Sequence, residues 1–207
     1  MSESEAIYSN TSRRRWLPDP RVAPHAQAIE ERMTQFSTNI RAANFMEFLD
    51  PLAQRLIADC FRDAVAHEGV IWMLDDEQKH LLCACQTGPA SSRLLNFRHP
   101  LTSGVSGMVL ATQQPFCENN LAANRASAST LEERFGVIVC SRVLVPFFIA
   151  GRVRGVVACY QTKASLEAPD PPGFGPDAVE EMSLLARLLG RLLDHKLLCA
   201  AIGLDED

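Results

Sequence analysis

The sequence predicts an α+β domain built around a buried antiparallel β-hairpin, with helices toward both ends of the chain. Between Ser141 and Tyr160, two apolar runs rich in β-branched and aromatic residues flank Ala150-Gly151. Both runs are apolar at most positions rather than at alternate ones, which is typical of strands buried on both faces, and the glycine can adopt the positive φ of a tight turn. Helical spacing of apolar residues precedes the hairpin over 24–44 and 50–67, and follows it over 177–201.

Composition limits the compartment and the partners of the chain. Its 207 residues are 47% hydrophobic and carry a net charge of −5, which disfavours nucleic acid and anionic membranes as partners. No uncharged apolar stretch reaches the ~18 residues of a membrane span, and the N-terminus lacks the apolar core of a signal peptide. The seven cysteines are scattered, which favours free thiols in a reducing compartment. We therefore expect a cytoplasmic protein that binds neither nucleic acid nor membranes.

The chain before the hairpin divides into three expected parts. Residues 1–23 form a polar, flexible extension whose basic cluster, Arg13–Arg15, is a solvated tail or a contact for an anionic partner. Residues 24–47 contain the N-terminal helix, and the main domain covers 48–202. That domain begins with a second helix, for which Asp50-Pro51 supplies a cap and a first-turn proline.

Short strands and turns are expected between the second helix and the hairpin. Apolar runs predict strands at 70–74, 79–87, 97–101 and 116–118. The glycine-rich turn Gly104–Gly107 precedes a short helix expected over 108–113, and capping-box spacing predicts another from Leu131. Gly155 lies inside the second arm of the hairpin, where the missing side chain indicates close approach by another part of the structure.

These segments, in this order, resemble a GAF domain. The matching residues are Gly104-Val105-Ser106-Gly107 with Val109 and Gln114-Pro115, then Ser141–Phe147, then Gly151–Val157. The resemblance covers about residues 48–198 and implies a PAS-related fold. In that fold a central antiparallel sheet carries the N- and C-terminal helices on one face, and loops and short helices over a ligand pocket on the other. GAF domains bind cyclic nucleotides, bilins, haem and other small molecules; some bind nothing and a few are enzymes.

A pocket between the sheet and its lid is the site that the resemblance implies. Its expected lining comprises Phe97, Gly104, Ser106, Val109, Phe116, Leu131, Phe135, Val145, Phe147 and Cys159. The alternative is that these side chains fill the space themselves. The Gly104–Gly107 turn offers backbone N–H groups to an anion or a carbonyl oxygen, unless Ser106 caps the helix and satisfies them internally. Neither the ligand nor a cofactor can be named from the sequence.

The family's ligand and catalytic signatures match this chain poorly. Cyclic-nucleotide-binding members carry an Asn-Lys…Phe…Asp-Glu pattern, but this chain has Asn124-Arg125-Ala126 followed by Glu132–Phe135, without the lysine and the Asp-Glu pair. The Asp-Ile-Pro of bilin-binding members does not occur either. Free methionine-(R)-sulfoxide reductases carry a cysteine in the glycine turn, where this chain has Ser106, and serine cannot attack sulfoxide sulfur as a thiolate does. A related redox enzyme would have to use Cys117 or Cys140. We therefore expect no catalytic residue.

Two further cysteines, Cys83 and Cys85, are two apart on a predicted strand. Their side chains are therefore expected on one face of the sheet. Residues at that spacing are slightly too far apart for an unstrained disulfide, and a metal site would need more ligands. We therefore expect two buried structural thiols.

The terminal helices predict a homodimer. Over 177–201 one apolar stripe can cover the sheet, but Leu184, Leu188 and Leu192 widen the apolar arc beyond that need. With Phe36 and Ile40 of the N-terminal helix, they could form a two-fold symmetric four-helix bundle; the alternative is that the helices pack only within one chain.

The resulting hypothesis is a non-catalytic sensory or regulatory module in which a small molecule or a partner protein biases the dimer interface. The alternatives are a redox enzyme related to the sulfoxide reductases and a ligand-free scaffold for protein–protein interaction. The order of elements supports the module in general, and no motif selects a ligand or a pathway.

Overall fold

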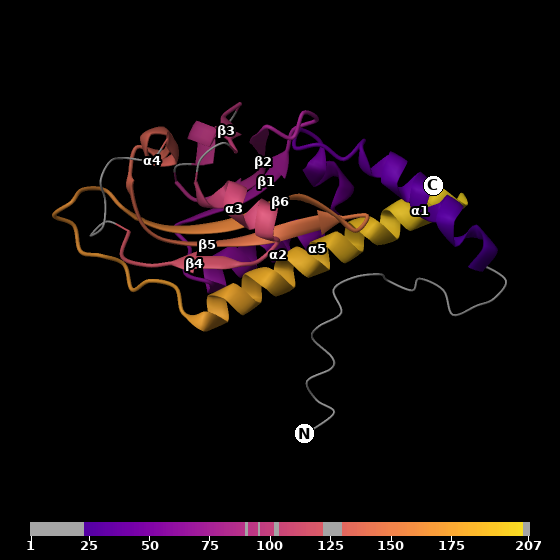
Figure 1. The fold of residues 1–207 in the computed structure, drawn as a ribbon. Helices are drawn as coiled ribbons and strands as arrows, with labels where there is room; N and C mark the ends of the chain where they lie inside the picture. Colours follow the sequence, from indigo (N-terminus) through magenta and orange to yellow (C-terminus); the bar gives the residue numbers. More distant parts are fainter. Residues whose placement is uncertain (1–22, 90, 95, 102–103, 122–129, 205–207) are drawn as a thin grey trace, which may run out of the picture.

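The computed structural model describes residues 23–204 apart from 90, 95, 102–103 and 122–129, so the expected extension at 1–23 lies outside the described residues except for its last residue. At its centre the described chain forms a six-stranded antiparallel sheet in the order β3-β2-β1-β6-β5-β4 (Figure 1). The strands are β1 (Glu68–Leu74), β2 (His80–Thr87), β3 (Arg98–Pro100), β4 (Phe116–Glu118), β5 (Ile138–Ile149) and β6 (Arg152–Lys163). The predicted α+β fold class is confirmed.

The predicted hairpin lies at the middle of the sheet. β5 and β6 pair from Ile138 and Lys163 down to Ile149 and Arg152, and β1 pairs with the other edge of β6. The two turn residues between them have φ of +50° and +73°. This left-handed conformation at both positions matches the right-handed twist of the strands that the turn joins.

Helices form separate layers on the two faces of the sheet (Figure 1). One face is covered by α5 (Pro176–Ile202) and α2 (Pro51–Asp63). On the C-terminal part of α5 packs α1 (Ala26–Ser37), which is preceded by η2 (Ala23–His25) and followed by η3 (Phe45–Phe48). The other face, which we call the lid face, is covered by α3 (Val105–Thr112), α4 (Thr130–Phe135) and η4 (Ser91–Leu94). The buried apolar residues form two clusters: the helix-face cluster between the sheet and α1, α2 and α5, and the lid-face cluster between the sheet and α3, α4 and η4.

α1 ends earlier than its apolar spacing predicts, at Ser37 rather than near residue 44. The hydroxyl groups of Ser37 and Thr38 each donate to a backbone carbonyl three residues back at 2.7 Å, and the side chain of Asn44 accepts from the N–H of Arg41 at 2.8 Å. Such local bonds give the backbone partners outside a helix. Ile40 therefore follows the helix in a turn and is buried in the core.

The predicted cap of α2 is confirmed. The carboxylate of Asp50 accepts from the N–H of Ala53 at 2.9 Å, and Pro51 occupies the first turn. α3 begins at Val105, earlier than the expected residue 108, because Gly104 at φ +99° supplies the turn that starts it. The start of α2, which has a strong local signal, was therefore predicted well, whereas the start of α3, which depends on a backbone angle, was predicted less well.

Two residues on the inner face of α5 join it to the hairpin. A Cβ on Gly190 would lie 2.6 Å from the carbonyl oxygen of Phe148, so glycine permits close approach here. The buried carboxylate of Asp194 accepts from the N–H of Ala150 in the hairpin turn at 2.6 Å. Although α5 has 27 residues, neither it nor any other described helix is long and apolar enough to cross a membrane.

The prediction that Cys83 and Cys85 share a face is wrong. In the β1–β2 ladder, Cys83 pairs with Trp72 and Cys85 with Ile71, so β2 carries one extra residue, Ala84, at a β-bulge. A bulge shifts the alternation of side chains by one position. Cys83 therefore packs on the lid-face cluster and Cys85 on the helix-face cluster.

Candidate functional site

Several aromatic rings meet in the lid-face cluster. Trp72 of β1 lies edge-on to Phe97, with ring centroids 6.4 Å apart, and 5.8 Å from the ring of His99 on β3. Phe135 of α4 packs on Tyr160 of β6 at 5.6 Å. Rings from three strands, from α4 and from the segment before β3 thus meet on the lid face, and an aromatic or apolar ligand under the lid would contact them.

His99 is the polar centre of this cluster. Its Nε2 lies 3.4 Å from the hydroxyl of Ser106 on α3, and its Nδ1 is buried without a hydrogen-bond partner among the described residues. Burial lowers the pKa of the imidazole, so the ring is neutral at pH 7. A neutral imidazole has one donor and one acceptor nitrogen, and can therefore offer its buried nitrogen to either kind of ligand atom.

A second polar pair lies deeper in the same cluster. The indole N–H of Trp72 donates to the hydroxyl of Tyr160 at 3.4 Å, and burial raises the pKa of that phenol to about 12. The phenol is therefore neutral at physiological pH.

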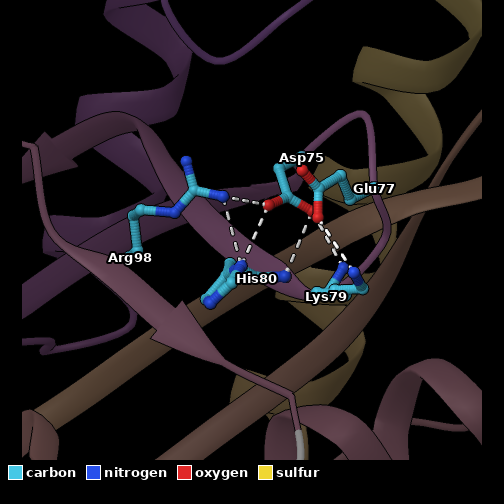
Figure 2. Close-up of polar contacts among 5 residues, drawn as sticks. All are labelled: Asp75, Glu77, Lys79, His80 and Arg98. Carbon is cyan, nitrogen blue, oxygen red and sulfur yellow. Dashed lines mark hydrogen bonds and ion pairs between the residues drawn. The ribbon is translucent and has the colours of Figure 1, made fainter.

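An ionic cluster at the turn between β1 and β2 fixes the strand that carries His99 (Figure 2). The Oδ2 atom of Asp75 accepts from Arg98 of β3 at 2.6 Å and lies 3.0 Å from Nδ1 of His80. Its Oδ1 atom accepts from the backbone N–H groups of Lys79 at 2.9 Å and His80 at 3.1 Å. Burial raises the pKa of the Asp75 carboxyl, but these hydrogen bonds and the Arg98 guanidinium outweigh burial and leave the pKa lowered. The three-residue edge strand β3 is thus anchored through the residue next to His99.

The arrangement of Ser106 and His99 does not make an activated nucleophile. Such a site needs a third group that orients the histidine, and no carboxylate contacts Nδ1 within the described chain. Ser106 also does not cap α3, because its hydroxyl faces His99 and the N-cap residue of the helix is Gly104, which has no side chain. The pair can bind and orient a ligand, but it lacks the parts of a catalytic triad.

Five of the seven cysteines also lack an activated thiol. Burial raises the pKa of Cys83 to about 12 and of Cys85 to about 11, and it also raises the pKa of Cys117, Cys140 and Cys159. Thiolate, rather than thiol, is the nucleophile, so these groups are poorly suited to attack. Within the described residues no group of three or more His, Cys, Asp or Glu side chains is arranged to hold a metal.

Most of the predicted pocket residues lie on the lid face. Five pack in or on the lid-face cluster or its polar centre: Phe97, Ser106, Val109, Leu131 and Phe135. Phe116 of β4 packs against the same cluster from the sheet edge, and Gly104 is exposed at the start of α3.

The placement of Val145, Phe147 and Cys159 under the lid was wrong. Phe147 packs edge-on against Phe45 at 5.8 Å, and the thiol of Cys159 lies 3.2 Å from the sulfur of Met182 on α5, so these side chains face the helices. Successive side chains of a strand point to opposite faces. Both arms of the hairpin are apolar throughout, so the sequence does not reveal which set of alternate residues faces the lid.

Three central residues of the site were missed: Trp72, His99 and Tyr160. Trp72 and Tyr160 lie in apolar runs and look like ordinary core residues. Tyr160 lies on the same face of β6 as Val156 and Ala158. If either of those two residues had been assigned to the lid face, the alternation of side chains would have assigned Tyr160 to it as well. Nothing in the sequence around His99 indicates its burial.

The predicted dimer residues are divided between core and surface. Ile40 is 1% exposed inside the single chain, so its assignment to an interface between chains was wrong. Phe36 and Leu192 are half-buried and pack on the helix-face cluster, and Phe36 lines an open groove of ≈ 280 Å³ between α1, η3 and α5. Leu184 and Leu188 remain on the surface of α5, 60% and 37% exposed.

Comparison with known proteins agrees with this geometry. The family model described as the GAF domain matches residues 42–194. The chain therefore belongs to the GAF domain family. No curated protein matches it.

Solved structures with this fold include GAF domains of other proteins and one enzyme. The GAF domain from a phosphoenolpyruvate-protein phosphotransferase of Coxiella burnetii is 18% identical with a TM-score of 0.55, over 87% of this chain and 98% of that one. The second GAF domain of DevS from Mycobacterium smegmatis is 14% identical with a TM-score of 0.52, over 70% and 94%. A type II free methionine-R-sulfoxide reductase from Thermoplasma acidophilum is 14% identical with a TM-score of 0.50, over 71% and 96%. Identities this low establish the shared fold alone.

Proposed function

We propose that this chain is a non-catalytic regulatory module that binds a small molecule under the lid and acts through the outer face of α5 in a homodimer. One observation carries the binding proposal: the buried Nδ1 of His99 has no hydrogen-bond partner among the described residues. A buried polar atom without a partner costs about 1–3 kcal/mol. A ligand that supplies the missing hydrogen bond recovers that free energy, which favours the bound state.

The surroundings of His99 restrict the chemistry of the ligand. Trp72 and Phe97 present ring faces and edges, and the polar groups described beside them, His99 and Tyr160, are neutral at pH 7. The site therefore suits an uncharged, mainly aromatic or apolar molecule with one hydrogen-bonding group. Because the rings of Phe97 and His99 already lie 6.1 Å apart, such a molecule enters by displacing Phe97, whose other side meets the guanidinium of Arg134 at 5.7 Å.

Neighbouring residues of β6 supply a route from the lid to α5. Tyr160 belongs to the lid-face cluster, whereas Cys159 contacts Met182 of α5 on the other face. A ligand that shifts Tyr160 therefore also shifts the strand against α5. The bond from Ala150 to Asp194 couples the hairpin turn to the same helix.

Native mass spectrometry of the freshly purified full chain tests ligand binding. We expect an added mass that disappears under denaturing conditions, and that is lost in His99→Leu but kept in His25→Leu, a control at an exposed histidine. An unmodified mass for the wild type, together with a higher melting temperature for His99→Leu, would show that the unpartnered nitrogen is only a structural cost.

A ligand-free scaffold is the second candidate, and the contacts among the lid-face rings favour it. Rings at 5.6–6.4 Å centroid separation are already in favourable aromatic geometry without a ligand. In that case the module works only through its helices. The same mass measurement separates the two candidates, because a scaffold carries no added mass in any variant.

The redox enzyme is tested by its reaction. Purified chain with thioredoxin should not consume free methionine (R)-sulfoxide, because the turn cysteine is replaced by Ser106 and burial raises the pKa of both Cys117 and Cys140. Consumption that is lost in the Cys117→Ser, Cys140→Ser double variant would overturn the non-catalytic proposal.

A further inference from the structure

The outer face of α5 carries a regular seam of exposed side chains. At alternating steps of four and three residues it presents Asp177, Glu181, Leu184, Leu188, Arg191 and His195, all exposed in the structure. This spacing is the one by which a helix faces another helix in a coiled coil. The inner face of α5 is already used against the sheet and α2, and α1 meets α5 beside Lys196, Leu197 and Ala200, so the seam points away from the rest of the chain.

The seam is chemically polarised along its length. Its N-terminal end is acidic, its middle is apolar and its C-terminal end is basic. The helix dipole favours acids in the first turn and bases in the last, but Glu181 lies in the second turn and Arg191 near the middle of a 27-residue helix. Glu181 and Arg191 lie ten positions apart, about 15 Å along the helix, so they cannot pair with each other in one chain.

We infer that two copies of this chain pair through α5 in antiparallel orientation, with the two-fold axis at the level of residue 186. Each seam residue then meets one at the same distance from that level. Leu184 packs on the partner's Leu188, Glu181 meets the partner's Arg191, and Asp177 meets the partner's His195. Every pair occurs twice because the interface is symmetric. This inference rests on the dimer in the proposed function and adds its orientation and register.

Charge excludes the other simple arrangement. In a parallel in-register pair, Glu181 would face its own copy and Arg191 would face its own copy, so each contact would be repulsive. The antiparallel pair converts all of them to attraction. It also sends the two α1 helices to opposite ends of the interface, so the dimer is a helix pair rather than the four-helix bundle that the sequence suggested.

Sedimentation equilibrium of the full chain tests the pairing through charge exchange. Glu181→Arg alone creates two contacts between arginines, and Arg191→Glu alone creates two between glutamates, so each variant should dimerise at least about tenfold more weakly than wild type. An equimolar mixture of the two variants should recover the wild-type dissociation constant, because the heterodimer restores both attractive pairs. Both residues are exposed, so melting temperatures measured on the monomers should stay unchanged.

Other outcomes overturn the inference in distinguishable ways. In a parallel dimer the single variants would match wild type and the mixture would bind more tightly than wild type. If Leu188→Glu and all charge variants leave the association state unchanged, α5 is not the interface. An added mass retained in those same samples would leave the binding half of the proposed function intact, whereas its absence from the wild type would be a failure of the binding half alone.

Discussion

Gly155 lies in the middle of β6, paired with Met73 of β1 on one side and Phe147 of β5 on the other. A Cβ at this position would overlap the carbonyl oxygen of Trp72 and lie 2.9 Å from its carbonyl carbon and 3.0 Å from the Cα of Met73. All three are backbone atoms of fully buried residues, so no side-chain rotation can relieve the overlap. We therefore expect Gly155→Ala to force β1 and β6 apart.

The expected cost follows from two opposing effects. Overpacking a well-packed core costs about 1–3 kcal/mol and occasionally more, and an obstacle made of backbone places this site at the upper end. Replacing glycine by alanine inside a strand offsets roughly 0.5–1 kcal/mol through lower chain entropy in the unfolded state. The net loss is about 2–3 kcal/mol, which for a domain of this size lowers the melting temperature by about 4–12 °C.

Urea unfolding of Gly155→Ala beside Gly151→Ala tests this reasoning. Gly151 is in the same hairpin with φ +73°, and a Cβ added there would have no heavy atom within 4 Å, so the control measures only the backbone strain of a left-handed alanine, about 1 kcal/mol. Equal or smaller destabilisation by Gly155→Ala, with unchanged m-value, would refute the close approach of the two strands.

Three further predictions concern charge and burial. The pKa of Asp75 is lowered in the fold, so its ionised form stabilises the protein above about pH 4, and that stabilisation is lost as pH falls through the folded-state pKa. Asp75→Asn should therefore destabilise the protein at pH 7 in urea melts, and its difference from wild type should shrink as pH falls below about 4. Burial raises the pKa of Tyr160 to about 12, and in Tyr8→Phe this residue is the only tyrosine left to titrate. Its ionisation, followed by ultraviolet absorbance, should therefore occur near pH 12 or together with unfolding, and a reversible midpoint near pH 10 in the folded protein would contradict its burial. Val145→Asp puts an unpaired charge in the core and should prevent soluble expression or cost more than about 3 kcal/mol; a soluble variant with unchanged melting temperature would contradict the position of this strand.

Local signals in the sequence were sufficient for most of the fold. The hairpin followed from two apolar runs and a glycine turn, the start of α2 from Asp50-Pro51, and the close approach at Gly155 from a glycine inside a strand. Each of these depends on neighbouring residues and on the backbone angles that they permit. The same signals, in order, also pointed to the family that the chain belongs to.

The candidate site was only partly predictable, because it depends on which face of the sheet each side chain occupies. A strand that is apolar at every position hides its own alternation, and so Val145 and Phe147 were placed under the lid while Tyr160 was missed. The bulge at Ala84 separates Cys83 from Cys85 through an irregularity of the ladder that has no sequence signature.

The sequence by itself therefore determined the elements and their order, since these depend on spacing along one chain. Only the tertiary structure decided that His99 is buried with its Nδ1 lacking a partner among the described residues, that Ile40 belongs to the core of one chain, and that Leu184 and Leu188 stay exposed. Burial is a property of what packs against a residue from distant segments. Hydrophobic free energy depends on the area removed from water, and that area is set only when β1, β6 and α5 come together.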